Sequence, residues 1–279
     1  MITTVRGLLA ATALAGAFVA APAFADDAAP PSDITITGSA AIVSQYRFRG
    51  LAQSDNKPAV QGAITISHSS GFYVSTWGSS ASAGNGPIDI GGTEIDVYGG
   101  YTHTFGDIGL TIDGGVYGYI YPGFSDANYF ELYGSVAKSY GPVTAKVGAY
   151  YAPAQKVFNL NFTSPSRKNL YVYGELGSAI PGTPLSIHSH LGHTGGGFNY
   201  AKQYWDYNVG ITAKWKNLAL DASIVGTDMK RSDILNGFAG TIGSDCESLS
   251  INDPCVADDV NYFYRMSKAV GVISLTASF

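Results

Sequence analysis

The sequence predicts an all-β protein: a transmembrane, antiparallel, up-and-down β-barrel of about 12 strands, with 10–14 possible. Apolar and polar residues alternate with a period of two along most of the chain, and only 13% of the 279 residues are charged. A soluble domain carries about twice that charged fraction. After Ala25, no apolar run approaches the roughly 20 residues of a spanning helix.

The alternation is clear in residues 106–121, where Ile108, Leu110 and Ile112 share one parity and Thr111 and Asp113 the other. A soluble β-sandwich also alternates, but its outer face would be rich in charge. Here the charges inside the segments fall on the polar face, so we expect the apolar face to point outward. The predicted strands span residues 34–50, 59–68, 71–79, 93–103, 106–121, 129–138, 142–151, 170–176, 185–191, 205–214, 218–225 and 269–279.

The connections between these strands alternate between short and long, as in outer-membrane barrels with short periplasmic turns and long extracellular loops. Short turns are predicted at His68, His103, Lys138, Ser178 and Lys214. Long extracellular loops are predicted at residues 79–92, 152–169 and about 228–268.

Aromatic residues near the strand ends predict two girdles at the membrane interfaces, although any single tyrosine could instead pack inside the barrel. The outer girdle would hold Tyr46, Phe48, Trp77, Tyr119, Tyr121, Tyr129, Tyr151, Tyr171 and Trp205. The inner girdle would hold Phe72, Tyr101, Phe105, Tyr140 and Trp215.

Residues 1–25 have the pattern of a cleaved secretory signal peptide: a basic start at Arg6, an apolar stretch, and small residues at Ala23 and Ala25. The mature chain, residues 26–279, is then predicted to be a barrel in the Gram-negative outer membrane. Without Arg6 it holds 15 basic and 21 acidic residues, a net charge of −6 that argues against nucleic-acid binding.

The last strand, AVGVISLTASF, ends in Phe279. It resembles the terminal strand of Gram-negative outer-membrane proteins, in which a final aromatic residue serves the barrel-assembly machinery. That resemblance implies the assembly machinery and outer-membrane lipid as partners.

Cys246 and Cys255 lie close together in a polar stretch of a chain that passes through an oxidising compartment, so we predict a disulfide that staples a loop. A metal or redox role is the less favoured alternative, because the spacing is not C-x-x-C and no histidine lies nearby.

The predicted function lies in the lumen: passive passage of ions or small hydrophilic solutes, without catalysis or a cofactor. An Arg or Lys facing lipid near the midplane would cost about 2–4 kcal/mol, so strand charges should turn inward, where they set ion preference or pair and plug the barrel. The acidic excess favours cations. The predicted lumen and selectivity residues are Arg47, Arg49, Glu94, Asp96, Asp113, Glu131, Lys146, Glu175, Asp206, Lys214 and Asp221. In the stretch SQYRFRG, the first strand is expected to run on to Gly50, with Tyr46 and Phe48 outward.

Two other functions remain open. His188 and His190 share a parity with Ser186, so an enzyme of the lipase or protease type, or a metal site, could be built on them. A closed structural or adhesive barrel could instead act through residues 228–268.

Two further groups of side chains are expected to lie at the surface. His68, His103 and His193 are assigned to turns or a loop. The acidic residues between 245 and 259 lack EF-hand spacing, which favours a solvated loop over a calcium site; they are Asp245, Glu247, Asp253, Asp258 and Asp259.

Residues 44–79, SQYRFRGLAQSDNKPAVQGAITISHSSGFYVSTWGS, resemble the start of the TorF-type porin family in the pattern Ser, Tyr, Arg-x-Arg-Gly, then Pro-x-x-Gln-Gly, Gly-Phe-Tyr and Trp. The E-x-D-x-Y-x-G-Y motif of residues 94–101 and the final Phe also fit. Ala63, where the family usually has glycine, and the long cysteine-containing loop depart from the pattern. The resemblance implies an outer-membrane channel with a poorly defined substrate.

Overall fold

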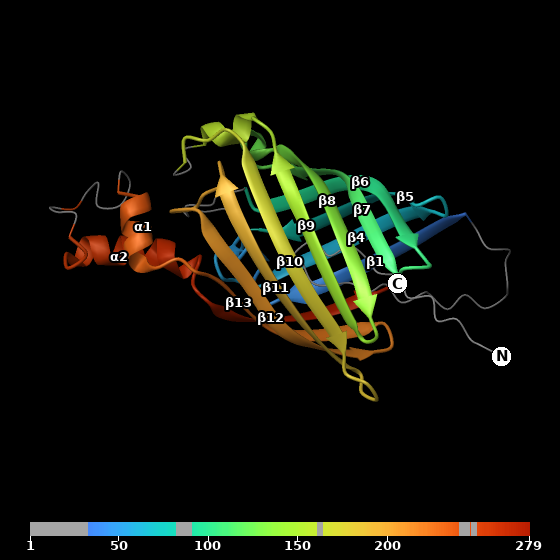
Figure 1. Cartoon of the computed structure of the whole chain (residues 1–279). Helices are drawn as coiled ribbons and strands as arrows, with labels where there is room; N and C mark the ends of the chain where they lie inside the picture. The colour runs from blue at the N-terminus through green and yellow to red at the C-terminus, as the bar shows by residue number, and fades with distance from the viewer. Residues whose placement is uncertain (1–32, 82–90, 161–163, 240–245, 247–249) are drawn as a thin grey trace, which may run out of the picture.

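Twelve strands form a closed antiparallel barrel, in agreement with the predicted fold class (Figure 1). The computed structural model describes residues 33–81, 91–160, 164–239, 246 and 250–279; the predicted signal peptide lies outside these ranges. The barrel strands are β1 (Ile34–Val43), β4 (Ala59–His68), β5 (Phe72–Ser80), β6 (Thr93–Phe105), β7 (Leu110–Ile120), β8 (Tyr129–Tyr140), β9 (Val143–Ala152), β10 (Asn169–Ala179), β11 (Leu185–Gly196), β12 (Tyr204–Trp215), β13 (Leu218–Thr227) and β14 (Val270–Ser278).

The barrel closes where β1 pairs with β14. Phe279 extends this seam, because its backbone exchanges two hydrogen bonds with Gly38, at 2.7 and 2.9 Å. Its ring lies over Gly38, where an added Cβ would come within 2.5 Å of a ring carbon. A side chain at position 38 would therefore displace the terminal aromatic ring. The role of Phe279 in assembly stays a prediction.

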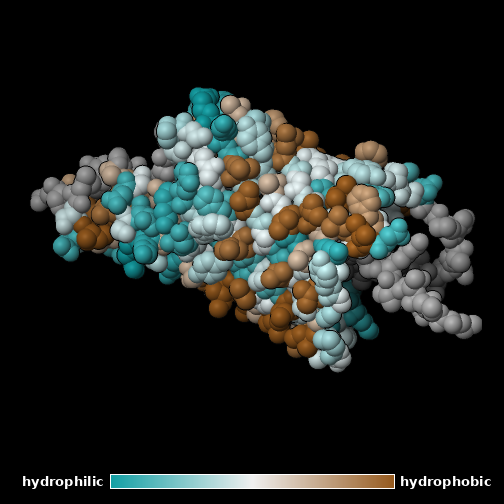
Figure 2. Space-filling model, in the orientation of Figure 1, coloured by the Kyte–Doolittle hydropathy of each residue, from teal (hydrophilic) through white to brown (hydrophobic). Residues whose placement is uncertain are grey.

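The outer face of the barrel is apolar, as predicted. Every barrel strand contributes exposed large apolar side chains, among them Ile36 at 66%, Val147 at 62% and Trp215 at 67% exposure. Figure 2 shows hydrophobic residues over the strands, with hydrophilic residues gathered at the end that carries the helices. Among the described residues, no helix is both long and apolar enough to cross a membrane.

The two ends of the barrel differ. Turns of two to five residues connect the strands at one end, here called the turn end, where Phe279 also lies. The opposite end, here called the loop end, carries the longer connections. They contain the short 3-10 helices η1 (Ser125–Ala127) and η2 (Lys156–Asn159). They also contain two α-helices, α1 (Arg231–Gly237) and α2 (Pro254–Arg265), and we call this pair the helical cap.

The prediction that the first strand runs to Gly50 is wrong. β1 ends at Val43, and residues 44–58, here called the plug segment, turn into the barrel. Its two short strands, β2 (Arg47–Phe48) and β3 (Leu51–Ala52), form a hairpin whose two loop residues, Arg49 and Gly50, have φ of 48° and 77°. Positive φ at both positions is the conformation of a tight type I′ hairpin, which the Arg-Gly dipeptide accommodates.

The predicted outer girdle is also largely wrong. Tyr151 and Trp205 do point outward, with 40% and 46% exposure. Six other members are buried instead: Tyr46, Trp77, Tyr119, Tyr121, Tyr129 and Tyr171. Phe48 is only partly exposed and packs on Tyr119, 5.7 Å between ring centroids. For the rings on β7, β8 and β10, alternation along the strand decides that the ring points inward, because each has the same parity as an inward carboxylate on its strand.

The five predicted inner-girdle residues are all exposed on the barrel, between 38% and 67%. His68 and His103 are exposed, as expected, but lie in β4 and β6. His193 belongs to β11, not to a loop, and its ring lies 4.8 Å from that of Trp205. Whether a side chain on a strand points outward or inward again follows its parity.

A charge on the outer face should destabilise the barrel more than the same charge on the inner face. We expect Val147→Arg to lower the free energy of folding into lipid vesicles by about 2–4 kcal/mol. Lys146→Arg, on the neighbouring residue, places the same side chain inward and should change it little. Equal losses in urea titrations of the two variants would contradict the assignment of faces.

Candidate functional site

The plug segment brings a charged side chain into the middle of the barrel. Arg49 reaches Glu131 on β8 with an Nη2–Oε2 distance of 2.5 Å, and the two side chains are 4% and 0% exposed. The Arg49 guanidinium also stacks on the Tyr171 ring, 4.1 Å from its centroid. Tyr119 donates a second hydrogen bond to Glu131, at 3.0 Å. The pair is thus desolvated and held from several sides.

Two further buried carboxylates, Glu94 and Asp96, project from β6 beside the plug segment. Glu94 accepts hydrogen bonds from the hydroxyls of Tyr46 and Tyr121, at 3.0 and 3.2 Å. Asp96 accepts one from Tyr117, at 2.9 Å. Among the described residues, no basic side chain lies within ion-pair distance of either carboxylate. Tyrosine hydroxyls therefore provide the polar contacts that cations provide elsewhere in the lumen.

A chain of polar contacts leads from the plug segment toward the turn end. The Tyr171 hydroxyl donates to Asp206, at 3.0 Å, and lies 2.7 Å from Nε2 of His190. Nδ1 of His190 lies 3.3 Å from Glu175, and Glu175 lies 3.7 Å from Lys146. Four strands, β9 to β12, supply these five side chains.

Nearer the turn end, the lumen side chains are more exposed to water. Asp221 lies 2.7 Å from Nε2 of His188 and accepts a hydrogen bond from Thr212, at 2.7 Å. The side chains of Asp221 and His188 are 22% and 26% exposed. On the opposite wall of the barrel, Tyr73 donates to Asp113, at 2.8 Å. Water access therefore rises from the buried centre toward the turn end.

Nine of the eleven predicted lumen residues lie inside the barrel and interact with each other or with tyrosine, histidine, serine or threonine side chains. Two differ. Arg47 donates to backbone carbonyls at the loop end, and Lys214 is exposed at the turn end. The sequence analysis did not predict that the strand tyrosines and Tyr46 lie in the lumen. The parity of Tyr117, Tyr119 and Tyr171 with the neighbouring charges was the available signal.

Arg47 connects the plug segment to the helical cap. Its guanidinium donates to the carbonyl oxygens of Gly50 and Met266, at 2.9 and 2.8 Å, and to Oδ1 of Asn56, at 2.6 Å. Leu51 and Ala52 of β3 belong to the same apolar cluster as the buried residues of the cap, which include Ile234, Val256 and Val260. The plug segment and the cap therefore pack as one unit.

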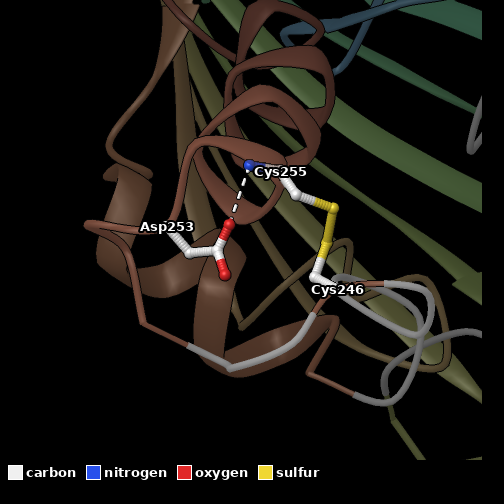
Figure 3. Close-up of a disulfide and its surroundings, with 3 residues drawn as sticks. All are labelled: Cys246, Asp253 and Cys255. Carbon is white, nitrogen blue, oxygen red and sulfur yellow. Dashed lines mark hydrogen bonds between the residues drawn. A yellow bond between two sulfur atoms is a disulfide. The ribbon is translucent and has the colours of Figure 1, made fainter.

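A disulfide between Cys246 and Cys255 confirms the predicted pairing. Figure 3 shows that it joins the preceding segment to the start of α2, where Asp253 caps the helix by accepting a hydrogen bond from the Cys255 N–H, at 3.0 Å. Asp245 and Glu247, two of the weighed calcium ligands, lie outside the described residues. Within the described ranges, no cluster of three His, Cys, Asp or Glu side chains could hold a metal ion.

Among the described residues, His188 and His190 are bonded to acidic and tyrosine side chains. In the part of the chain that the structure describes, His188 contacts Asp221, and His190 contacts Tyr171, Glu175 and Asp206. Ser223 also donates to Asp221, so the carboxylate, and not the histidine, receives the serine hydroxyl. A nucleophile requires its hydroxyl at the base.

Residues 27–245 match the profile of a family described as "Bacterial protein of unknown function (Gcw_chp)". A search of curated proteins found no sequence match. The KdgM porin, solved in complex with disordered oligogalacturonate, is similar in structure with a TM-score of 0.51 at 10% identity, over 88% of this chain and 99% of that chain. Salmonella typhi OmpF in complex with daunomycin has a TM-score of 0.40 at 7% identity, over 88% and 97%. The KdgM similarity shows a porin-type barrel fold.

Breaking the central ion pair should destabilise the barrel strongly. We expect Arg49→Met to lower the free energy of unfolding by about 3–5 kcal/mol, because Glu131 then stays buried without its cation. The double variant Arg49→Met, Glu131→Gln should lose less, because no unpaired charge remains. Lys156→Gln is the control: its exposed partner is Asp126, and its loss should stay below about 1 kcal/mol. A double variant less stable than Arg49→Met would contradict this account.

Proposed function

Because the chain belongs to the Gcw_chp family of bacterial proteins and folds as a porin-type barrel, we propose that it is an outer-membrane channel for ions or small hydrophilic solutes. One observation carries the proposal: charged side chains follow one another through the lumen, and their exposure rises from 0% at Glu131 to 17% at Glu175 and 22% at Asp221. Such a lining can exchange an ion's water shell for fixed polar groups.

The apolar outer face and the predicted signal peptide support insertion in the outer membrane, with the loop end outside the cell. Lipid then surrounds the strands, and the barrel-assembly machinery acts on the C-terminal strand. The resemblance of residues 44–79 to the TorF-type porins supports the same function.

In the conformation described, the plug segment closes the outer half of the lumen. Arg49, Glu131 and Asp206 fill this level and are almost fully buried. A solute can pass only when the plug segment moves, and its contacts with the helical cap oppose that movement. We therefore propose that the channel is gated by residues 44–58, with Arg47 holding the closed state.

A closed structural or adhesive barrel is the second candidate, because a fully buried polar network is also what a permanently plugged barrel contains. On this account the helical cap is the functional part. Current through a planar lipid bilayer separates the two candidates, because only a channel conducts.

Releasing the plug segment should increase conduction. We expect Arg47→Gln to raise the open probability in planar bilayers by about tenfold or more, because hydrogen bonds from a charged donor contribute about 1.5–3 kcal/mol each. Lys57→Gln removes a charge from the same segment at a side chain that is 72% exposed, and should leave the open probability unchanged. If neither wild type nor Arg47→Gln gave unitary currents, the closed barrel would be the better account.

The charges along the lumen should set ion preference. Lys146 and Glu175 face each other with 12% and 17% exposure, so neutralising either one leaves the other to act on passing ions. We expect Lys146→Gln to shift the reversal potential in a salt gradient toward cation selectivity, and Glu175→Gln to shift it toward anion selectivity. Shifts in the same direction would remove both residues from the conduction path.

A further inference from the structure

A basic hollow lies on the loop end of the barrel, outside the lumen. Its volume is about 310 Å³, and its lining comes from Tyr151, Ala154, Ser166, Arg167 and Lys168. These residues follow β9 and precede β10, two strands that pair directly. The hollow therefore occupies the rim of the wall between two neighbouring strands.

The two cations of the hollow, Arg167 and Lys168, are both exposed. Among the described residues, neither side chain has a carboxylate within ion-pair distance. Several other cations at the loop end do have such a partner, including Lys57, Lys156, Lys202 and Arg265. Two adjacent exposed cations match the needs of a phosphate group.

The hollow also lies at the edge of the apolar outer face. Tyr151 points outward and is directly opposite Leu170 on β10 and Leu132 on β8. These three side chains are 40%, 48% and 47% exposed. An exposed tyrosine between apolar and charged residues is typical of the depth at which lipid headgroups begin. Cations therefore lie directly above a surface suited to acyl chains.

We propose that this hollow binds the phosphorylated headgroup of an outer-leaflet lipid. Arg167 and Lys168 contact the phosphate, and the acyl chains lie along Tyr151, Leu170 and Leu132. Charge near an anionic lipid supplies the affinity, and the adjoining apolar surface selects a lipid over a free anion. The site is independent of whether the lumen conducts, because its lining includes none of the charged residues of the lumen.

The test uses the full mature chain, refolded in a neutral detergent, with bisphosphorylated lipid A as the probe and native mass spectrometry as the readout. We expect the double variant Arg167→Gln, Lys168→Gln to bind this lipid roughly thirtyfold more weakly, since each cation near an anionic lipid contributes about fivefold. Heat-dependent migration in SDS gels checks that each variant is folded.

The matched control is Lys57→Gln, Lys268→Gln, which removes the same charge from exposed positions that do not line the hollow. Its affinity should equal that of wild type. An equal loss in both double variants would mean that net charge, and not this hollow, attracts the lipid, and would overturn the proposal.

Two arms without a variant complete the test. Lipid A stripped of its phosphates should bind wild type as weakly as intact lipid A binds the Arg167→Gln, Lys168→Gln variant. Millimolar inorganic phosphate should leave the intact lipid bound. Undiminished binding of the stripped lipid would overturn the phosphate contact, and displacement by inorganic phosphate would overturn the assignment to a lipid.

Discussion

The rest of the structure depends on one constraint: each strand of the barrel wall has one face outside and one face inside. A strand that exposes Val147 to the outside must turn Lys146 inward, and the same holds around the whole wall. Charged residues are therefore concentrated in a narrow lumen, where burial makes each one costly unless it has a partner. The tyrosines, the histidines and the plug segment supply those partners.

The plug segment enters the lumen and completes this network, whereas the strands line the lumen. Arg49 reaches the lumen because the chain leaves the wall after Val43 and makes a tight hairpin inside the barrel. Glu131 would otherwise be a buried carboxylate with only a tyrosine hydroxyl as its partner. The same segment carries Arg47, which contacts carbonyls at the end of α2. Closure of the lumen and packing of the helical cap are thus two consequences of one short stretch.

The two ends of the barrel suit different surroundings. The turn end has minimal connections and exposed aromatic residues such as Tyr140 and Trp215 on its outer side. The loop end has a disulfide-stapled helical cap and a basic hollow that borders the apolar face. This asymmetry supports an orientation in which elaborated chain faces the exterior and short turns face the periplasm. It also concentrates the parts we propose to act, the gate and the lipid site, at one end.

The sequence by itself determined the barrel, because a period of two is a local property that any short window reveals. The same parity correctly turned Glu94, Asp96 and Asp206 inward. Tertiary structure alone decided where the first strand ends, since the segment that leaves the wall after Val43 is stabilised by distant residues such as Glu131, eighty-eight positions away. The Arg-Gly dipeptide and the turn residues Asp55 and Asn56, both with positive φ, were local signals of this break. The contacts that this segment makes with distant strands could not be predicted from a short stretch of sequence, because contacts across a lumen depend on strand register and on closure of the barrel.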